Sequence, residues 1–418
     1  MTLTGSNHDE THGPTRRRFL GLSAACLTGA CSLGAEAFAG EEERPSLRGA
    51  ALTSLGKAYY FLGSMMDLYS KGAALRLSQS YVPTQALDLG DEGFTYDNAV
   101  MLIAFLQRGQ AGDLTRANVL GNSLVYGQNH DPAGDGRVRN SYHTDPYILS
   151  GGALNIDDEG SYTGNLAWTG LALGQLYQRT KTRSYLNAAV RIGNWIQNNT
   201  SDTRGAGGYT GGLDSSLSTI PWKSTEHNID VYALFTMLAS LTANSAWTTR
   251  AQYALGFIEA MWDSGEFFWT GTGTDGITIN TDFIPEDCQS WSYLALKNAA
   301  YASSIDWVYA NLAATDGQFS GVSFSNADTS GVWFEGTGHM ATAFEARNNP
   351  GDSAKAAAFL ADIQAGQASA PNTDGHGVDA ASKDDLDTGD GFDYFAALHI
   401  GATSWYCIAD QSGNPFRL

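Results

Sequence analysis

Basic residues are scarce in this sequence: 24 Lys and Arg stand against 44 Asp and Glu, which gives a formal net charge of −20 at pH 7. A surface of that sign repels nucleic acid and anionic membranes, because both carry negative charge. Beyond the N-terminal segment, no apolar run reaches the length that a membrane span needs. We therefore expect no nucleic-acid partner and no membrane span in the mature chain.

Several common site motifs are also missing. No Cys/His cluster has zinc-ligand spacing, there is no serine nucleophile elbow, and the glycine-rich stretch 207–212 lacks the Lys of a phosphate loop. Asp385, Asp387 and Asp390 are spaced as in a calcium loop, but the glycine falls out of the EF-hand register. We favour an acidic flexible loop there and expect no cofactor.

The first residues have the pattern of an export signal. Arg16-Arg17 and Phe19-Leu20 precede a weakly apolar run that ends at Ala37-Phe38-Ala39. This pattern resembles a twin-arginine signal with a signal peptidase site. It predicts that residues 1–39 are removed, and that residues 40–418 form a single exported domain in the periplasm or outside the cell.

Only Cys288 and Cys407 remain after such processing, so a disulfide framework is excluded. The two either pair with each other in an oxidising compartment or stay as buried free thiols. The oligomeric state leaves no clear mark in the sequence, and we expect a monomer.

Helical periodicity divides the rest of the chain into two kinds of segment. Residues 184–198 place Leu186, Ala189 and Ile196 on one stripe and polar groups elsewhere, which is typical of a helix with one solvated face. Further amphipathic helices are expected at about 47–71, 113–127, 247–262, 302–313 and 352–366. Nearly uncharged segments, which predict enclosed helices, lie at 98–107, 165–177, 229–241, 289–300, 339–346 and 399–409.

The connections between these segments alternate in length. An enclosed helix is followed after a few residues by an amphipathic one, whereas the return takes about 20 residues or more, as in 199–224 and 367–396. Short connections therefore gather at one end and long ones at the other. Six such hairpins resemble the (α/α)6 toroid shared by many glycosidases, some polysaccharide lyases and some sugar epimerases. An open helical solenoid is the less favoured alternative, since its repeats are shorter and more alike.

Ionisable and aromatic residues recur where the enclosed helices begin, beside the long connections. Each acid alone could be a helix cap, and each His a hydrogen-bonded core residue. A closed ring would bring them together, however, and clustered carboxyl groups in one place indicate catalysis. The candidate catalytic residues are Glu335, Glu226, Asp97, Asp287 and Asp230.

Paired carboxyl groups suit glycosidic bond hydrolysis, which needs one acid to protonate the leaving oxygen and one carboxylate as base or nucleophile. We expect Glu335, beside Trp333 and Phe334, to be the proton donor and Glu226 to be the base. Aromatic faces and polar groups at the same helix starts suit sugar rings and hydroxyl groups. The candidate substrate-binding residues are Tyr96, Asn98, Trp168, His227, Trp291, Trp333, His339, His399 and Trp405.

The sequence thus predicts an exported glycoside hydrolase for a neutral oligo- or polysaccharide. A lyase or epimerase is an alternative, in which His227, His339, His399, His143 or Tyr142 moves a proton and Arg137, Arg139 or Lys223 binds a uronate. A glycan-binding protein without catalysis is a third possibility.

Overall fold

The structure is a computed structural model that describes residues 52–418, of which Thr53–Leu418 form one compact unit. The expected export signal and its cleavage position lie outside the described residues. Within the described part, no helix is both long and apolar enough to cross a membrane.

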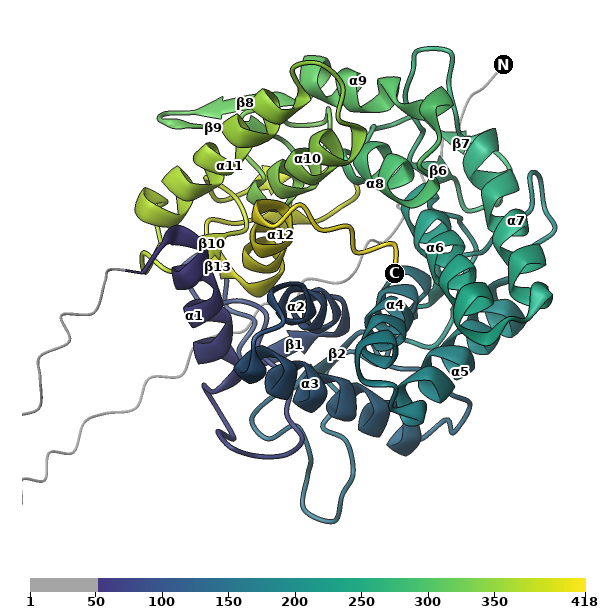
Figure 1. Cartoon of the computed structure of the whole chain (residues 1–418). Helices are drawn as coiled ribbons and strands as arrows, with labels where there is room; N and C mark the ends of the chain where they lie inside the picture. Colours follow the sequence, from purple (N-terminus) through teal and green to yellow (C-terminus); the bar gives the residue numbers. More distant parts are fainter. Residues whose placement is uncertain (1–51) are drawn as a thin grey trace, which may run out of the picture. The chain divides into compact units, whose positions relative to one another are not determined.

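Residues 52–418 contain twelve α-helices in two concentric rings (Figure 1). Each inner helix contacts the next inner helix, and the last contacts the first, so the ring closes. The chain therefore adopts the expected (α/α)6 toroid. The outer helices are α1 (Ser54–Met66), α3 (Ala111–His130), α5 (Arg183–Thr200), α7 (Ser245–Ala260), α9 (Ser303–Asn311) and α11 (Asp352–Ser369). The inner helices are α2 (Thr95–Arg108), α4 (Thr163–Thr180), α6 (Thr225–Thr242), α8 (Asp287–Leu296), α10 (Phe334–Arg347) and α12 (Ile400–Asp410).

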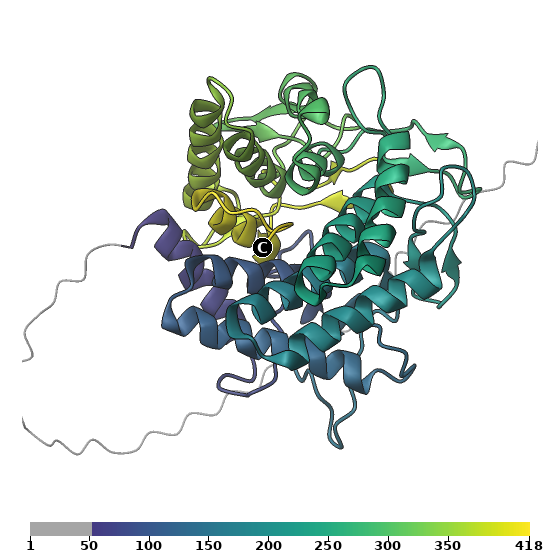
Figure 2. The same ribbon diagram turned by 45° about the vertical axis from the view of Figure 1, so that its right-hand side comes forward.

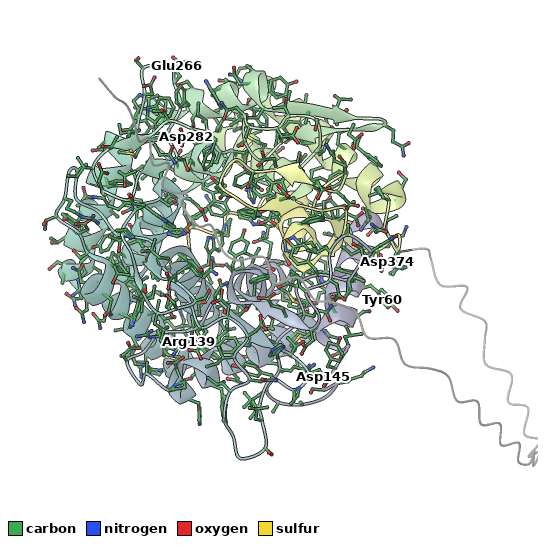
Figure 3. The ribbon with its side chains drawn as sticks, turned by 180° about the vertical axis from the view of Figure 1, so that it is seen from behind. Tyr60, Arg139, Asp145, Glu266, Asp282 and Asp374 are labelled. Carbon is green, nitrogen blue, oxygen red and sulfur yellow. The ribbon has the colours of Figure 1, made fainter. Side chains whose placement is uncertain are left out.

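Short antiparallel strands occur in the long connections that precede the inner helices. They pair as β1–β2, β3–β4–β5, β6–β7, β8–β9, β10–β13 and β11–β12. Their bounds are β1 (Glu92–Phe94), β2 (Ser141–His143), β3 (Ser161–Tyr162), β4 (Gly212–Leu213), β5 (Thr219–Ile220), β6 (Gly271–Thr272), β7 (Ile279–Asn280), β8 (Ala313–Asp316), β9 (Phe319–Val322), β10 (Val378–Asp379), β11 (Leu386–Asp387), β12 (Asp393–Tyr394) and β13 (Leu398–His399). Seen from behind, four exposed acids of these connections, Asp145, Glu266, Asp282 and Asp374, are spread around the rim (Figure 3).

Left-handed residues at the C-terminal ends of the inner helices explain the short connections. Gly109, Lys181, Ala243, Lys297 and Asn348 have φ between 52° and 64°, which ends a helix and reverses the chain. At Lys297 this turn ends α8 earlier than the periodicity predicts, and a 3₁₀ turn at Ala299–Tyr301 follows.

A circular series of backbone hydrogen bonds joins the repeats where the inner helices begin. In each repeat, the N–H of the residue that opens the inner helix donates to a carbonyl in the long connection of the next repeat, at 2.7 to 3.0 Å. The pairs are Thr95 to Asn140, Thr163 to Gly211, Thr225 to Thr270, Glu286 to Phe324, Phe334 to Ala380 and Ile400 to Ser80. The sixth repeat binds the first, so the same bonds that satisfy free helix N–H groups also close the ring.

In five inner helices, a side chain in the first turn binds the long connection that precedes its own helix. The helix start of the preceding repeat binds the same connection. The oxygen of this side chain accepts a backbone N–H of the connection, and its own donor binds the carbonyl four residues earlier. The residues are Asn98, Asn228, Gln289, Thr337 and Thr403. Asn98, expected to bind substrate, is fully buried and uses its amide on Ser78 and Phe94, which indicates a structural role.

Cys288 on α8 and Cys407 on α12 are both buried free thiols. Of the two alternatives left open by the sequence, the structure therefore has the unpaired one.

Candidate functional site

The five candidate acids all lie at the N-terminal ends of inner helices. Asp97 is on α2, Glu226 and Asp230 are on α6, Asp287 opens α8, and Glu335 is on α10. Glu226 is close enough to Asp287 and Glu335 for both charges to raise its pKa. Residues that are far apart in the sequence are thus neighbours at one end of the ring, because the inner helices run in the same direction.

Glu335 is the centre of a hydrogen-bonded group. The Tyr96 hydroxyl donates to its Oε1 at 2.5 Å, and the Trp405 indole donates to the Tyr96 oxygen at 2.9 Å. His339 Nε2 lies 3.8 Å from Oε1, and His399 Nδ1 lies 3.4 Å from Oε2. Burial alone would raise the pKa of Glu335, but His339, His399 and Tyr96 outweigh burial and hold this pKa below its usual value.

Each of these two histidines has a second carboxylate on its other ring nitrogen. His339 Nδ1 lies 2.9 Å from Glu286 Oε2, and His399 Nε2 lies 3.1 Å from Asp97 Oδ1. Burial opposes protonation of His339, yet Glu286 and Glu335 raise its pKa to about 9. Burial also disfavours the charged form of His399, but Asp97 and Glu335 raise its pKa above the usual value.

His399 has a further contact that favours the neutral ring. The backbone N–H of Ala402 points at Nδ1 from 3.2 Å, which requires a lone pair on that nitrogen. Tyr81 stacks on the imidazole with ring centroids 4.1 Å apart. The ring therefore lies between Asp97, Glu335 and Tyr81.

The acids on α6 and α8, unlike Glu335, have surroundings that raise their pKa values. Glu226 is half-buried, and burial, followed by Asp287, Asp390 and Glu335, raises its pKa well above the usual value. Asp230, one turn further along α6, is fully buried, and neither of its oxygens makes a hydrogen bond. Burial, Glu226 and Asp287 raise its pKa strongly, although the nearby Trp168 indole opposes the shift.

Asp287 shares this side of the site. Burial and the adjacent Glu286 raise its pKa to about 7, while His339 and the Cys288 backbone N–H oppose the rise. Three carboxyl groups therefore gather on α6 and α8 without a cation of their own, and their proton-bound forms are favoured.

His227 lies on the same side but is not charged. Burial lowers its pKa to about 4, and its Nδ1 has no hydrogen-bond partner. A Cβ at Gly164 of α4 would come within 2.6 Å of the His227 ring, so glycine is what allows this close approach. The half-buried Trp222 packs against His227 at 5.7 Å.

Three tryptophans expected to bind sugar pack together in the interior of the ring. Trp168, Trp291 and Trp405 pack on one another with centroids 5.1 to 5.8 Å apart. Phe416 of the C-terminal tail joins them, and both views show the chain end near the centre of the ring (Figure 2). Trp333 is also buried, against Phe324 and Tyr394. Because these buried rings contact one another, their arrangement indicates packing. Less buried aromatics are therefore better placed to stack on sugar.

Half-buried aromatics beside the acids are Tyr81, Tyr96 and Tyr394. Tyr394 is on β12, and its pKa is raised by burial and by Glu335, Tyr81, Asp287 and Asp390. Glu286, Tyr81 and Tyr394 have no role in the sequence-based hypothesis. Tyr81 and Tyr394 lie in long connections where no periodicity marks them, whereas Glu286 could have been noticed as the neighbour of Asp287.

Five of the eight residues suggested for a lyase or epimerase are engaged in contacts outside the acid cluster. Arg137 pairs with Asp135, the buried Arg139 with Asp131, and the buried Lys223 Nζ binds the carbonyls of Arg204 and Gly207. His143 is held between Asp91 and Asp157, and the Tyr142 hydroxyl accepts the Arg139 N–H.

The acidic loop forms the β11–β12 hairpin. No group of three His, Cys, Asp or Glu side chains in residues 52–418 is arranged to hold a metal ion. Asp387 accepts the Gly389 N–H, and Asp390 accepts the Thr388 hydroxyl. Since Asp390 also raises the pKa of Glu226, the β11–β12 hairpin reaches the acids of α6.

Comparisons with known proteins show similarity in structure alone. No protein-family model and no curated protein sequence matches the chain. A sugar epimerase from a ruminal bacterium superposes with a TM-score of 0.63 at 12% identity, covering 86% of this chain and 99% of the other. A family 76 glycoside hydrolase from a bovine Bacteroides thetaiotaomicron strain gives 0.61 at 12% identity, covering 86% and 78%. A D-mannose isomerase gives 0.60 at 11% identity, covering 88% and 99%.

These similar structures are all carbohydrate-active enzymes built on the same toroid. At such identities they support the fold. They include a hydrolase, an epimerase and an isomerase, and the similarity does not distinguish between these activities.

Proposed function

We propose that this protein is a glycoside hydrolase that cleaves a neutral oligo- or polysaccharide. The observation that carries the proposal is the contrast between the contacts of two glutamates at the helix starts. Glu335 receives the Tyr96 hydroxyl and faces two histidines, which lower its pKa, whereas Glu226 is surrounded by other acids, which together with burial raise its pKa. A pair of carboxyl groups whose surroundings separate their pKa values supplies one base and one acid at the same pH.

The electrostatics favour a division of roles opposite to the one expected from the sequence. Glu226, protonated and half-exposed, gives its proton to the glycosidic oxygen as the bond from that oxygen to the anomeric carbon breaks. Glu335, ionised and held by Tyr96 and two histidines, either removes a proton from the attacking water or attacks the anomeric carbon itself. If Glu335 attacks the anomeric carbon, Glu226 then removes a proton from the incoming water and is restored as water cleaves the glycosyl bond to Glu335. If Glu335 instead takes the water proton, exchange with solvent removes that proton from Glu335 and returns one to Glu226.

A neutral substrate agrees with the charges around the site. Arg137, Arg139 and Lys223 are all engaged in ion pairs or carbonyl contacts, so they do not offer a free cation to a uronate. The acids at the helix starts are suited to accept hydrogen bonds from sugar hydroxyl groups.

A sugar epimerase or isomerase is the second candidate, and His399 is the observation in its favour. Its Nδ1 accepts the Ala402 N–H, which favours the neutral ring, and a neutral imidazole is the form that can act as a base once that lone pair is free. The neighbouring carboxylates favour the protonated ring instead, and they leave this mechanism without a ready base. A lyase or a non-catalytic glycan-binding protein has less support.

The cellular setting remains part of the proposal. The twin-arginine-like pattern at residues 16–20 supports export of a single domain, residues 40–418, to the periplasm or outside the cell. The acidic surface supports a soluble monomer that avoids anionic polymers.

One experiment separates the candidates. The purified mature protein is incubated in deuterated water with α- and β-glucans, mannans, arabinans and uronates, and the products are analysed by chromatography and NMR. Hydrolysis releases new reducing ends without carbon-bound deuterium. Deuterium on a sugar carbon, or an unsaturated product that absorbs ultraviolet light, would replace the hydrolase proposal with an epimerase or a lyase.

A further inference from the structure

Glu286 is a buried carboxylate that the proposed reaction does not use. It precedes α8 and is fully buried, and its backbone N–H closes the ring by binding Phe324. Its Oε2 lies 2.9 Å from His339 Nδ1, while its Oε1 has no hydrogen-bond partner. A buried charge of this kind is stable only with a counterion, and His339 is the one that it contacts.

His339 is also fully buried, and three tryptophan indoles surround it. The rings of Trp405, Trp291 and Trp333 lie 4.2, 5.0 and 5.1 Å from the imidazole. In such apolar surroundings burial favours the neutral imidazole, so a cation there depends on its carboxylates. Glu286 is the nearer of the two, because the second nitrogen lies 3.8 Å from Glu335.

We propose that Glu286 is a positioning residue: through the bridging His339 imidazolium, it fixes the orientation of Glu335 and keeps Glu335 ionised. The inference rests on the proposed function, because it assumes that ionised Glu335 is needed for activity. Glu286 touches no reacting atom and acts only through the imidazole.

The arrangement repeats on the other oxygen of Glu335. Asp97 lies against His399 Nε2, and His399 Nδ1 lies 3.4 Å from Oε2, so a second series of carboxylate, imidazole and carboxylate forms when the ring is protonated; in the neutral ring Nδ1 accepts the Ala402 N–H instead. One series starts at Asp97 on α2 and the other at Glu286, just before α8. Both end at Glu335 of α10. The ionisable groups that interact with Glu335 are Tyr96 on α2, Glu226 on α6, His339 on α10, His399 on α12, and Tyr81 and Tyr394 in the connections. Asp97 lies beyond His399, and Asp287 acts on Glu226.

The test is Glu286→Gln, which keeps the shape and an acceptor for His339 Nδ1 but removes the charge. Histidine ¹³C NMR of the full chain, assigned with His339→Gln, should show the pKa of His339 falling by about one to three units. The acidic limb of the kcat/KM profile should move to higher pH while the plateau changes little. A role limited to packing would lower activity equally at every pH.

Matched variants keep the outcome interpretable. Asp379→Asn removes another buried acid, whose pKa is raised by burial to about 7. This acid does not contact His339. The pKa of His339 and the acidic limb of the kcat/KM profile should therefore stay as in the parent protein. If Glu286→Gln fails to fold, Glu286→Asp retains the charge and should keep the parent acidic limb. An unchanged His339 titration in Glu286→Gln would overturn the inference. If the protein proves not to be a hydrolase, the NMR titration still tests the link from Glu286 to His339.

Discussion

Glu335 and Glu226 are each the second residue of an inner helix, yet their surroundings differ in almost every respect. Glu335 receives a tyrosine hydroxyl and faces two histidines. Glu226 has acids for neighbours, namely Asp287, Asp390 and Glu335. The first surroundings stabilise a carboxylate and the second a carboxylic acid.

The comparison shows that burial by itself does not fix the protonation state of a carboxyl group. Burial is the largest influence on both glutamates and raises both pKa values, but only at Glu335 do partners reverse the shift. The repeated helix start places equivalent residues at equivalent points, and the residues of neighbouring repeats then decide their chemistry.

The largest effect should come from removing the ionised partner. Glu335→Gln keeps the shape but cannot act as base or nucleophile, so kcat should fall on the order of 10⁴-fold. Glu345→Gln, the same change on the same helix away from its N-terminal end, is the control and should retain activity. Retained turnover in Glu335→Gln would contradict the assignment.

The next largest effect should come from Glu226→Gln, and it should depend on the leaving group. A glycan with a poor leaving group should react about 10²- to 10³-fold more slowly, because its oxygen must be protonated. An aryl glycoside with an acidic phenol needs little protonation and should lose far less rate. Equal losses on both substrates would show that Glu226 is not the acid.

The pH profile should reflect the same contrast. Activity should rise at a pH below the usual glutamate value of 4.5 as Glu335 ionises, because the pKa of Glu335 is lowered. Activity should decline at a pH well above 4.5 as Glu226 loses its proton. The alkaline limb should disappear in Glu226→Gln, and its persistence would assign that limb to another group.

A smaller effect should follow from Tyr96→Phe. The change removes one hydrogen bond to a charged group, which corresponds to about a tenfold loss of kcat/KM. It should also move the acidic limb upward, since the hydroxyl favours ionised Glu335. Tyr309→Phe on α9, an exposed tyrosine far from the helix starts, should change neither quantity.

The last effect should be on stability and not on activity, at Asp230. Its pKa is raised in the folded state, so the stabilisation from its bound proton is complete below the unfolded value of 3.8 and is lost as pH rises through the folded value. Asp230→Asn removes this pH dependence. At pH 8 the free energy of unfolding of the variant, compared with that of the parent protein, should be more favourable by about 1–3 kcal/mol than the same comparison gives at pH 4. Urea midpoints at the two pH values measure the difference. An unaltered pH dependence would show that Asp230 does not take up a proton on folding.

The fold was predictable because periodicity is a local property. All six amphipathic and six enclosed segments fall on observed helices, and the alternation of loop lengths predicted the ring. The cap at Lys297 was missed because a left-handed lysine has no distinct sequence pattern.

The site was only partly predictable. The cluster of acids followed from the ring, but its electrostatics depend on which side chains of neighbouring repeats meet. Nothing in the sequence indicates that Asn98 binds backbone, that Trp168 and Trp405 pack together, or that Glu286 reaches His339. The roles of Glu335 and Glu226 could therefore be assigned only from residue type and from the Trp333 and Phe334 that precede Glu335, and the contacts argue for the reverse.

The most direct test is ¹³C NMR of the side-chain carboxyl groups in glutamate-labelled protein, with Glu335→Gln and Glu226→Gln used for assignment. The expected result is that Glu335 titrates below pH 4.5 and Glu226 well above it. If Glu226 is the ionised group at neutral pH and Glu335 the protonated one, the account of the site is contradicted.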